Sequence, residues 1–184
     1  GVYRVTATSE DRTDWPGGAN TPAEKATASV TAPQPLSSWS RELWLPMAKS
    51  AGREEFVKVA IDSKQPVSQR IRAIEILVSE FSGLLADEVS SLQKDSAPEI
   101  RARAIWAVGR TSSPGQKLAA QFLADPDPYV GRVAAESLLG KPGGLSDPGF
   151  IKSLVGRLSS PDRFDRMAAA RIVPQLDEKV FRQL

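Results

Sequence analysis

The side chains in this sequence that could take part in chemistry are carboxylates, lysines and tyrosines. The 184 residues include no cysteine and no histidine. Their absence excludes cysteine nucleophiles, Ser-His-Asp triads and metal sites built on thiolate or imidazole, because those sites require these two residue types. We therefore expect neither a cofactor nor a metal ion.

Two carboxylates, Glu75 and Glu136, are candidates for an acid and base pair that would hydrolyse a glycosidic or similar bond. Such a pair needs its carboxyl groups within about 10 Å. Residues 140–144 (Gly-Lys-Pro-Gly-Gly) invite comparison with a phosphate-binding loop, but they lack the Gly-x-x-x-x-Gly-Lys-Ser/Thr order and follow a predicted helix rather than a strand. We interpret them as a connection between helices. Whether the two glutamates could cooperate depends on the helices that carry them.

The elements that must position these residues are paired helices. From Leu36 onward, apolar residues recur at helical spacing, with Pro, Gly or Asp and Ser clusters between the segments. First helices are predicted at 54–62, 84–94, 114–124 and 147–158, and the second helices have apolar stripes that start near Gln69, Ile100, Val130 and Phe164. Further helices are predicted at 39–49, where Pro46 must kink or shorten the helix, and at 178–184.

An internal repeat supports this assignment. Ala73, Ala104, Ala134 and Ala168 occupy one position of the second helices and lie 31, 30 and 34 residues apart. Large apolar residues lie four positions later, at Leu77, Val108, Leu138 and Ile172, and four positions earlier, at Ile100, Val130 and Phe164. A stripe with a small residue in its middle lets a neighbouring helix approach closely. Pro66, Pro98, Pro128 and Pro161 lie at or just before the helix starts, where proline is tolerated.

The predicted fold is all-α, a right-handed α-α superhelix of about four to five helix pairs with a non-helical N-terminal extension. Residues 1–35, rich in Pro, Gly and Thr, are expected to be an extended or disordered linker, and residues 36–184 to be the solenoid. The last predicted helix leaves an open apolar face, so we expect truncation or self-association at this end. With about 10 Å between neighbouring repeats, Glu75 and Glu136 are too distant to cooperate. No catalytic residue is expected.

The segments 95–109 and 125–140 resemble the HEAT repeat, whose second helix typically opens Asp-x-x-Pro-x-Val-Arg and closes Ala-Leu-Gly. This resemblance covers about 150 residues and implies a HEAT-like solenoid. The sequence departs from the pattern at Gln69, where Val is usual, at Gly131 and Asp165, where Arg is usual, and by one extra residue after Pro161. These departures weaken a regular Asp-Arg ladder without disturbing the apolar positions.

Residues 1–6 (Gly-Val-Tyr-Arg-Val-Thr) resemble the final strand of a β-propeller blade in large bacterial secreted proteins. In those proteins a propeller, a HEAT segment and often a cytochrome c module follow one another, and the propellers are dehydrogenase-like. This resemblance implies a spacer or docking segment within a larger oxidoreductase-like protein. The chain would then be exported or periplasmic, and cytoplasmic otherwise.

One face of the second helices is the expected binding surface. With 100° per residue, Trp106 falls nearly opposite the buried stripe, in one column with Glu75 and Glu136. In a HEAT stack this face is concave, and aromatic and arginine residues are common at binding hot spots. The candidate partner-binding residues are Glu75, Arg103, Trp106, Arg132, Glu136 and Arg166. The alternatives are that Trp106 packs between repeats, and that the recurrent arginines pair with acidic residues at the helix starts.

The charge of the chain favours a protein partner, or an adjacent domain of the same parent chain. Lys and Arg number 24 against 22 Asp and Glu, for a net charge of +2. This balance argues against nucleic acid, whose binding domains concentrate a larger positive excess on one face. No apolar run approaches the roughly 18 to 20 residues that span a bilayer, so membrane insertion is not expected. The predicted function is that of a non-catalytic interaction or scaffold module.

Overall fold

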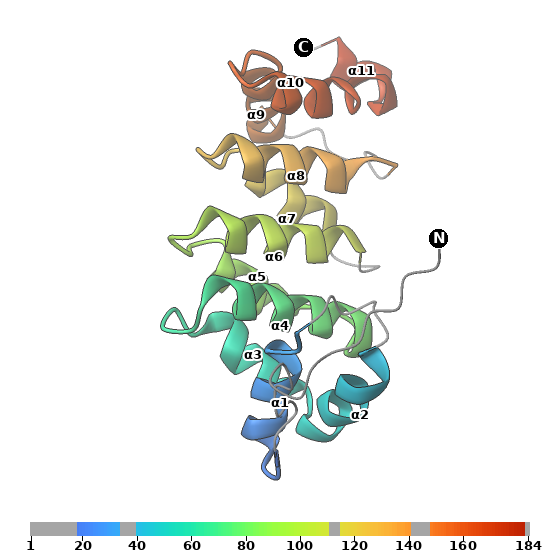
Figure 1. The fold of residues 1–184 in the computed structure, drawn as a ribbon. Helices are drawn as coiled ribbons and strands as arrows, with labels where there is room; N and C mark the ends of the chain where they lie inside the picture. Colours follow the sequence, from blue (N-terminus) through green and yellow to red (C-terminus); the bar gives the residue numbers. More distant parts are fainter. Residues whose placement is uncertain (1–17, 34–39, 111–114, 141–147, 183–184) are drawn as a thin grey trace, which may run out of the picture. The chain divides into compact units, whose positions relative to one another are not determined.

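The computed structural model describes residues 18–33, 40–110, 115–140 and 148–182, which form helices joined by turns, with no strand among them (Figure 1). The contacts divide the chain into two compact units, residues 1–55 and 56–184. The prediction of an all-α fold is confirmed, and each unit is described below by itself. The strand predicted at residues 1–6 lies outside the described residues.

The N-terminal unit contains α1 (Pro22–Val30), a helix where we predicted an extended or disordered linker. That prediction is wrong for these residues because Thr21-Pro22 starts a helix instead of ending one. The Thr21 hydroxyl accepts a hydrogen bond from the Glu24 N–H at 3.2 Å, and the Glu24 carboxylate accepts one from the Thr21 N–H at 2.9 Å. This reciprocal pair is a capping box, and Pro22 fits the first helical position.

The second helix of this unit, α2 (Arg41–Ala51), packs against α1. It matches the helix predicted at 39–49, and it continues through Pro46 to Ala51, so the expected shortening did not occur. Trp44 and Ala48, one turn apart, are fully buried. Residue 39 lies outside the described range.

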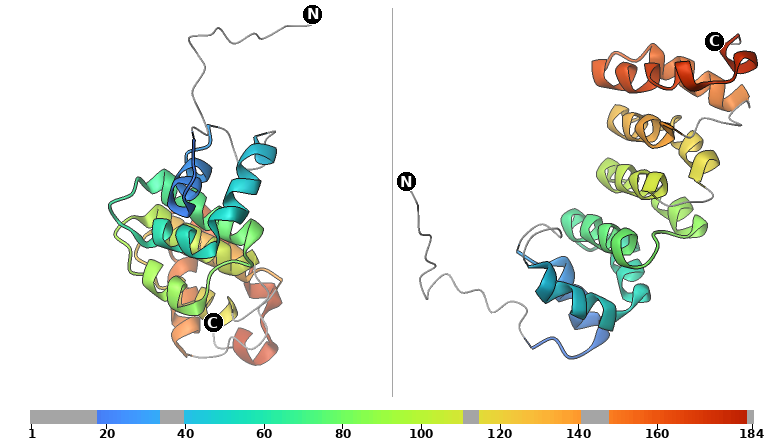
Figure 2. Two further views of the ribbon diagram at one scale, coloured as in Figure 1. Left: turned by 90° about the horizontal axis from the view of Figure 1, so that it is seen from below. Right: turned by 90° about the vertical axis from the view of Figure 1, so that its right-hand side faces the viewer.

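The C-terminal unit repeats a helix pair. Its first helices are α3 (Arg53–Ile61), which begins within the N-terminal unit, α5 (Ala86–Leu92), α7 (Gly115–Phe122) and α9 (Pro148–Leu158). Its second helices are α4 (Val67–Glu80), α6 (Pro98–Arg110), α8 (Pro128–Leu138) and α10 (Arg163–Ala170). The second helices lie side by side in chain order, and the first helices form another layer (Figure 2). A 3-10 turn (Val173–Gln175) and α11 (Glu178–Phe181) follow.

The core of this unit confirms the small-residue repeat in its first three pairs. Ala73, Ala104 and Ala134 are completely buried, and the large apolar residues at either side of them are buried too. Neighbouring second helices make extensive contacts, most of all α6 with α8. The small alanines allow this close approach, while the flanking side chains fill the space around them.

The fourth second helix differs from the prediction by one residue. Phe164 was expected in the buried stripe with Ile100 and Val130, but 58% of its surface is exposed. Asp162 caps α10 as Asp127 caps α8, so Phe164 corresponds to Tyr129, the second residue of α8. Pro161 directly precedes the cap, as Pro126 precedes Asp127, so the extra residue predicted after Pro161 is not there. Asp165 therefore takes the buried position that Val130 holds in α8.

Candidate partner-binding surface

Two arginines of the second helices connect successive repeats. The Arg70 guanidinium pairs with Asp95, and its Nε donates to the Ala60 carbonyl at 2.9 Å. Arg101 binds both carboxylate oxygens of Asp125, with Nε at 2.7 Å and a terminal nitrogen at 3.0 Å. For these two arginines, the interpretation that they pair with acids at the helix starts is confirmed. They hold the repeats together and are not open to a partner.

Asp95 gives this arrangement a pH dependence. Burial acts to raise the pKa of Asp95, but hydrogen bonds from Arg70 and from the Ala97 N–H, with the charges of Arg70 and Arg101, bring it below its usual range. A lowered pKa contributes stability above the unfolded-state value of about 3.9, and this stability is lost as the pH falls through the folded-state value. Thermal unfolding measured from pH 7 to pH 2 should show this acid loss.

The matched variant is Arg70→Gln, which removes the main partner of Asp95 and should weaken this acid dependence. Arg182→Gln is the control, because it breaks an exposed pair with Glu178 that contributes little. If wild type and Arg70→Gln lose stability equally between pH 5 and pH 2, the pairing of Asp95 does not contribute as described.

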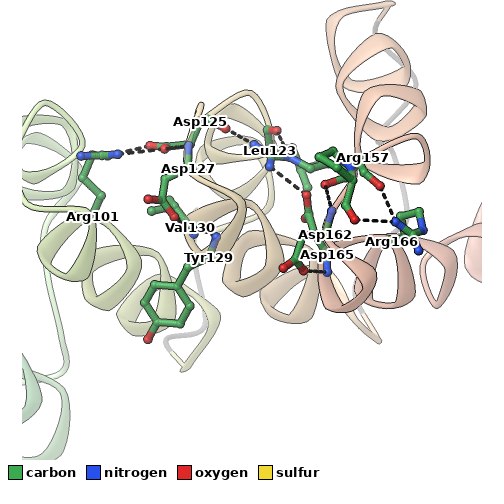
Figure 3. A network of polar contacts seen from close by, with 12 residues as sticks. Arg101, Leu123, Asp125, Asp127, Tyr129, Val130, Arg157, Asp162, Asp165 and Arg166 are labelled. Carbon is green, nitrogen blue, oxygen red and sulfur yellow. Dashed lines mark hydrogen bonds and ion pairs between the residues drawn. The ribbon is translucent and has the colours of Figure 1, made fainter.

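The arginine series is interrupted at Gly131, and Arg157 from α9 takes its place (Figure 3). A Cβ atom at residue 131 would overlap the Arg157 guanidinium. Arg157 Nε donates to the Leu123 carbonyl just after α7 at 2.7 Å, much as Arg70 Nε donates to the Ala60 carbonyl near the end of α3. Arg157 also donates to the Asp125 carbonyl and pairs with the fully buried Asp165 at 3.0 Å. Arg157 thus fills the space left by Gly131 and supplies the counter-charge of Asp165. Through this arginine the two departures from the repeat pattern compensate each other.

Arg166, one of the predicted partner-binding residues, resumes the series. Its guanidinium donates to the carbonyls of Ser160 and Pro161 at 2.6 and 2.9 Å. Arg101 makes the corresponding bonds to the carbonyls five and six residues before it. Arg166 therefore stabilises the turn before α10, although its side chain remains exposed.

Trp106 lies half-buried on the second-helix face between two arginines of its own helix. The Arg103 guanidinium lies 4.7 Å from the ring centroid and that of Arg110 lies 4.5 Å from it. Arg103 also pairs with Glu75 of α4 at 3.2 Å. Cation–π contacts with two arginines restrict the indole, so little conformational entropy is lost when a partner covers it.

A hollow of about 240 Å³ lies beside this ring, between α6 and α8. It is lined by Trp106, Gly109, Arg110, Val133, Glu136, Ser137 and Leu139. Its floor is tight, because a Cβ atom at Gly109 would lie 2.9 Å from the Ser137 Cβ, and the Ser137 hydroxyl donates to the Ile105 carbonyl at 3.3 Å. Trp106 and Glu136, predicted to share a column, thus line one hollow.

Arg132 makes a second arginine and aromatic cluster. Its guanidinium lies 5.2 Å from the Tyr129 ring centroid and 6.0 Å from that of Phe164. Tyr129 is in α8 and Phe164 in α10, so Arg132 contacts rings of two successive repeats. Of the six predicted residues, Glu75, Arg103, Trp106 and Glu136 gather around α6 and its neighbours, while Arg132 belongs to this separate cluster.

Comparison with known proteins gives one match. A family model described as HEAT repeats covers residues 86–173. Residues 86–173 are thus similar to HEAT repeats. They begin at the first residue of α5 and include the three helix pairs α5 to α10. No curated protein and no solved structure matches the chain significantly. HEAT repeats generally mediate protein–protein interaction and generally act as non-catalytic scaffolds.

Three residues of the second-helix face were missed in the sequence, namely Arg110, Tyr129 and Phe164. Arg110 lies four residues after Trp106, a spacing at which helical side chains meet, and so could have been found. Tyr129 and Phe164 each follow an Asp by two residues, and this shared Asp-x-aromatic order was the available indication that they correspond.

The carboxylates Glu75 and Glu136 of the second-helix face have different surroundings. Glu75 pairs with Arg103, whereas Glu136 is exposed beside the Trp106 hollow. Within the described ranges, no group of three or more Asp or Glu side chains could hold a metal ion. In the same ranges no helix has the length and apolar character needed to cross a membrane.

Proposed function

We propose that the chain is a non-catalytic interaction module that binds a protein partner, or a neighbouring domain of its own parent chain, through the face of its second helices. The observation that carries this proposal is the half-buried Trp106 held between Arg103 and Arg110 beside an open hollow. Tryptophan and arginine are the residues most enriched at binding hot spots, and hot spots lie in pre-formed hollows.

The layer of first helices is less suited to this role. Its exposed apolar residues, such as Val155 of α9, are single side chains of a kind common on any surface. The second helices supply Trp106, Glu136 and Arg110 to one concavity, where an aromatic ring, a cation and a carboxylate lie together. We therefore assign partner binding to the second-helix face.

The variant Trp106→Ala tests this proposal. A partner isolated with the full chain and then purified should bind the variant at least about 30-fold more weakly in calorimetry, the loss typical of a hot spot of 2 kcal/mol. The midpoint of thermal unfolding should change little, because Trp106 is not part of the buried core. Val155→Ala, an exposed apolar truncation on the other layer, is the control.

Two outcomes would count against this assignment. Equal affinities of wild type and Trp106→Ala would place the partner elsewhere on the chain. A large fall in the unfolding midpoint would instead show that Trp106 packs between repeats as a core residue, which is the alternative considered for it from the sequence.

The alternative function, a spacer or docking segment of a propeller-containing oxidoreductase-like protein, stays a prediction. It depends on residues 1–6, which lie outside the described ranges. The gene sequence upstream of residue 1 would test it: a propeller encoded there supports it, and a start codon close by contradicts it.

A further inference from the structure

Arg132 is a cation of the second-helix face that pairs with no carboxylate among the described residues. Its recorded contacts are with the rings of Tyr129 and Phe164. The acids that cap α8 and α10 are used elsewhere. Asp127 accepts hydrogen bonds from the N–H groups of residues 129 and 130, and Asp162 accepts one from that of residue 165. The charge of Arg132 is therefore available to a partner.

The two rings around Arg132 are exposed, and so is Met167, which lies three residues after Phe164 on α10. Tyr129, Phe164 and Met167 keep 42%, 58% and 44% of their surface in solvent. Figure 3 shows the Tyr129 ring pointing away from the buried arginine network. Together, Tyr129, Arg132, Phe164 and Met167 form what we call the Arg132 patch. A patch that combines exposed apolar area with a pre-oriented cation fits an interaction site.

The chemistry of a stacked arginine indicates what the patch would bind. A guanidinium held over aromatic rings keeps its charge and its planar N–H donors, and it suits a carboxylate that can accept two hydrogen bonds. Arg163 and Arg166, both exposed on α10, add positive charge beside the patch. The complementary group is therefore a carboxylate next to an apolar side chain.

A protein segment fits better than a nucleic acid. The exposed acids Glu99 of α6 and Glu136 of α8 interrupt the positive charge along the second-helix face. A phosphate backbone would meet these acids, whereas a peptide can place single carboxylates against single arginines. The net charge of only +2 agrees with this choice.

We propose that the Arg132 patch binds an acidic segment of the protein partner, with a carboxylate on Arg132 and an apolar side chain against Phe164 and Met167. This inference rests on the proposed function, because it names the kind of partner that the second-helix face receives. The patch is distinct from the Trp106 hollow, and none of its four residues lines that hollow.

The test uses the whole chain and three labelled probes in fluorescence anisotropy. The first is a peptide of about ten residues with glutamates around one leucine, the second is its counterpart with glutamine in place of glutamate, and the third is an oligothymidylate of similar length. The acidic peptide should bind at least about tenfold more tightly than the glutamine peptide, the difference expected of one charge-assisted pair. Arg132→Gln should remove this advantage, Arg132→Lys should retain part of it, and Lys152→Gln on α9 should leave it unchanged.

Several results would overturn the inference. Equal binding of the two peptides would show that the patch is only an apolar surface. Tighter binding of the oligothymidylate would indicate a nucleic-acid site. If the acidic peptide does not bind at about millimolar concentration, the patch does not bind acidic segments. Circular dichroism checks that Arg132→Gln is folded. Trp106→Ala should bind the acidic peptide normally. If the acidic peptide does not bind but Trp106→Ala still weakens binding of the partner, only the inference about the acidic segment is rejected, and the proposed function is not.

Discussion

Gly131→Ala is expected to lower the free energy of unfolding by about 3 kcal/mol, although alanine favours a helix over glycine by about 1 kcal/mol. The added Cβ would overlap the Arg157 guanidinium. An arginine end can usually move aside, but this one is fixed by the Leu123 and Asp125 carbonyls and by Asp165. Moving it would leave the buried Asp165 without its counter-charge, which is costly.

The matched control for this substitution is Gly156→Ala on α9. Gly156 is also helical, and nothing lies within 4 Å of a Cβ added there. Its replacement should raise the free energy of unfolding by up to about 1 kcal/mol. Urea unfolding followed by far-ultraviolet circular dichroism would measure both. Stabilisation by Gly131→Ala equal to that by Gly156→Ala would show that Arg157 does not occupy the space beside residue 131.

Arg157→Met is expected to cost about 3 to 5 kcal/mol of unfolding free energy, the effect of removing one partner of a buried ion pair. The methionine keeps most of the apolar stem but leaves Asp165, which has no exposed surface, uncompensated. The Leu123 carbonyl loses its hydrogen bond as well. The same urea experiment would measure the loss.

A compensating triple variant tests whether this cost arises because Arg157 replaces the arginine that is missing at residue 131. Asp165→Val gives α10 the residue type that Val130 has in α8, and Gly131→Arg restores the arginine present at residues 70 and 101. Combined with Arg157→Met, these changes should recover most of the lost stability. A triple variant as unstable as Arg157→Met alone would contradict the correspondence between Arg157 and the missing arginine.

Most of the fold could be predicted from the sequence because more than one residue type recurs at a fixed position of the repeat. Ala73, Ala104 and Ala134 mark the close approach of helices, and Pro98 and Pro128 mark helix starts. The helix α1 was missed because the Pro, Gly and Thr content of residues 1–35 indicates a linker, although Thr21 and Glu24 form a capping box that begins a helix.

The register of α10 could not be decided from its apolar pattern. Helical spacing is satisfied by Phe164, Ala168 and Ile172 as well as by the observed register, in which Asp165 matches Val130. The N-cap of Asp162 distinguishes these two registers. The role of Arg157 was equally hidden, since it lies 26 residues after Gly131 and in a first helix. A long side chain that replaces a missing one from another element leaves no local periodicity to detect.

The most direct test of the central claim is site-specific photo-crosslinking in the full chain. A photoreactive phenylalanine analogue at Glu136, beside the Trp106 hollow, is compared with the same analogue at Gln121, exposed on α7 of the first-helix layer. We expect the analogue at residue 136 to crosslink a defined protein or neighbouring domain, Trp106→Ala to abolish this product, and the purified partner to bind wild type. Crosslinking of the same partner from Gln121 but not from Glu136, or a Glu136 product unaffected by Trp106→Ala, would contradict the assignment of partner binding to the second-helix face.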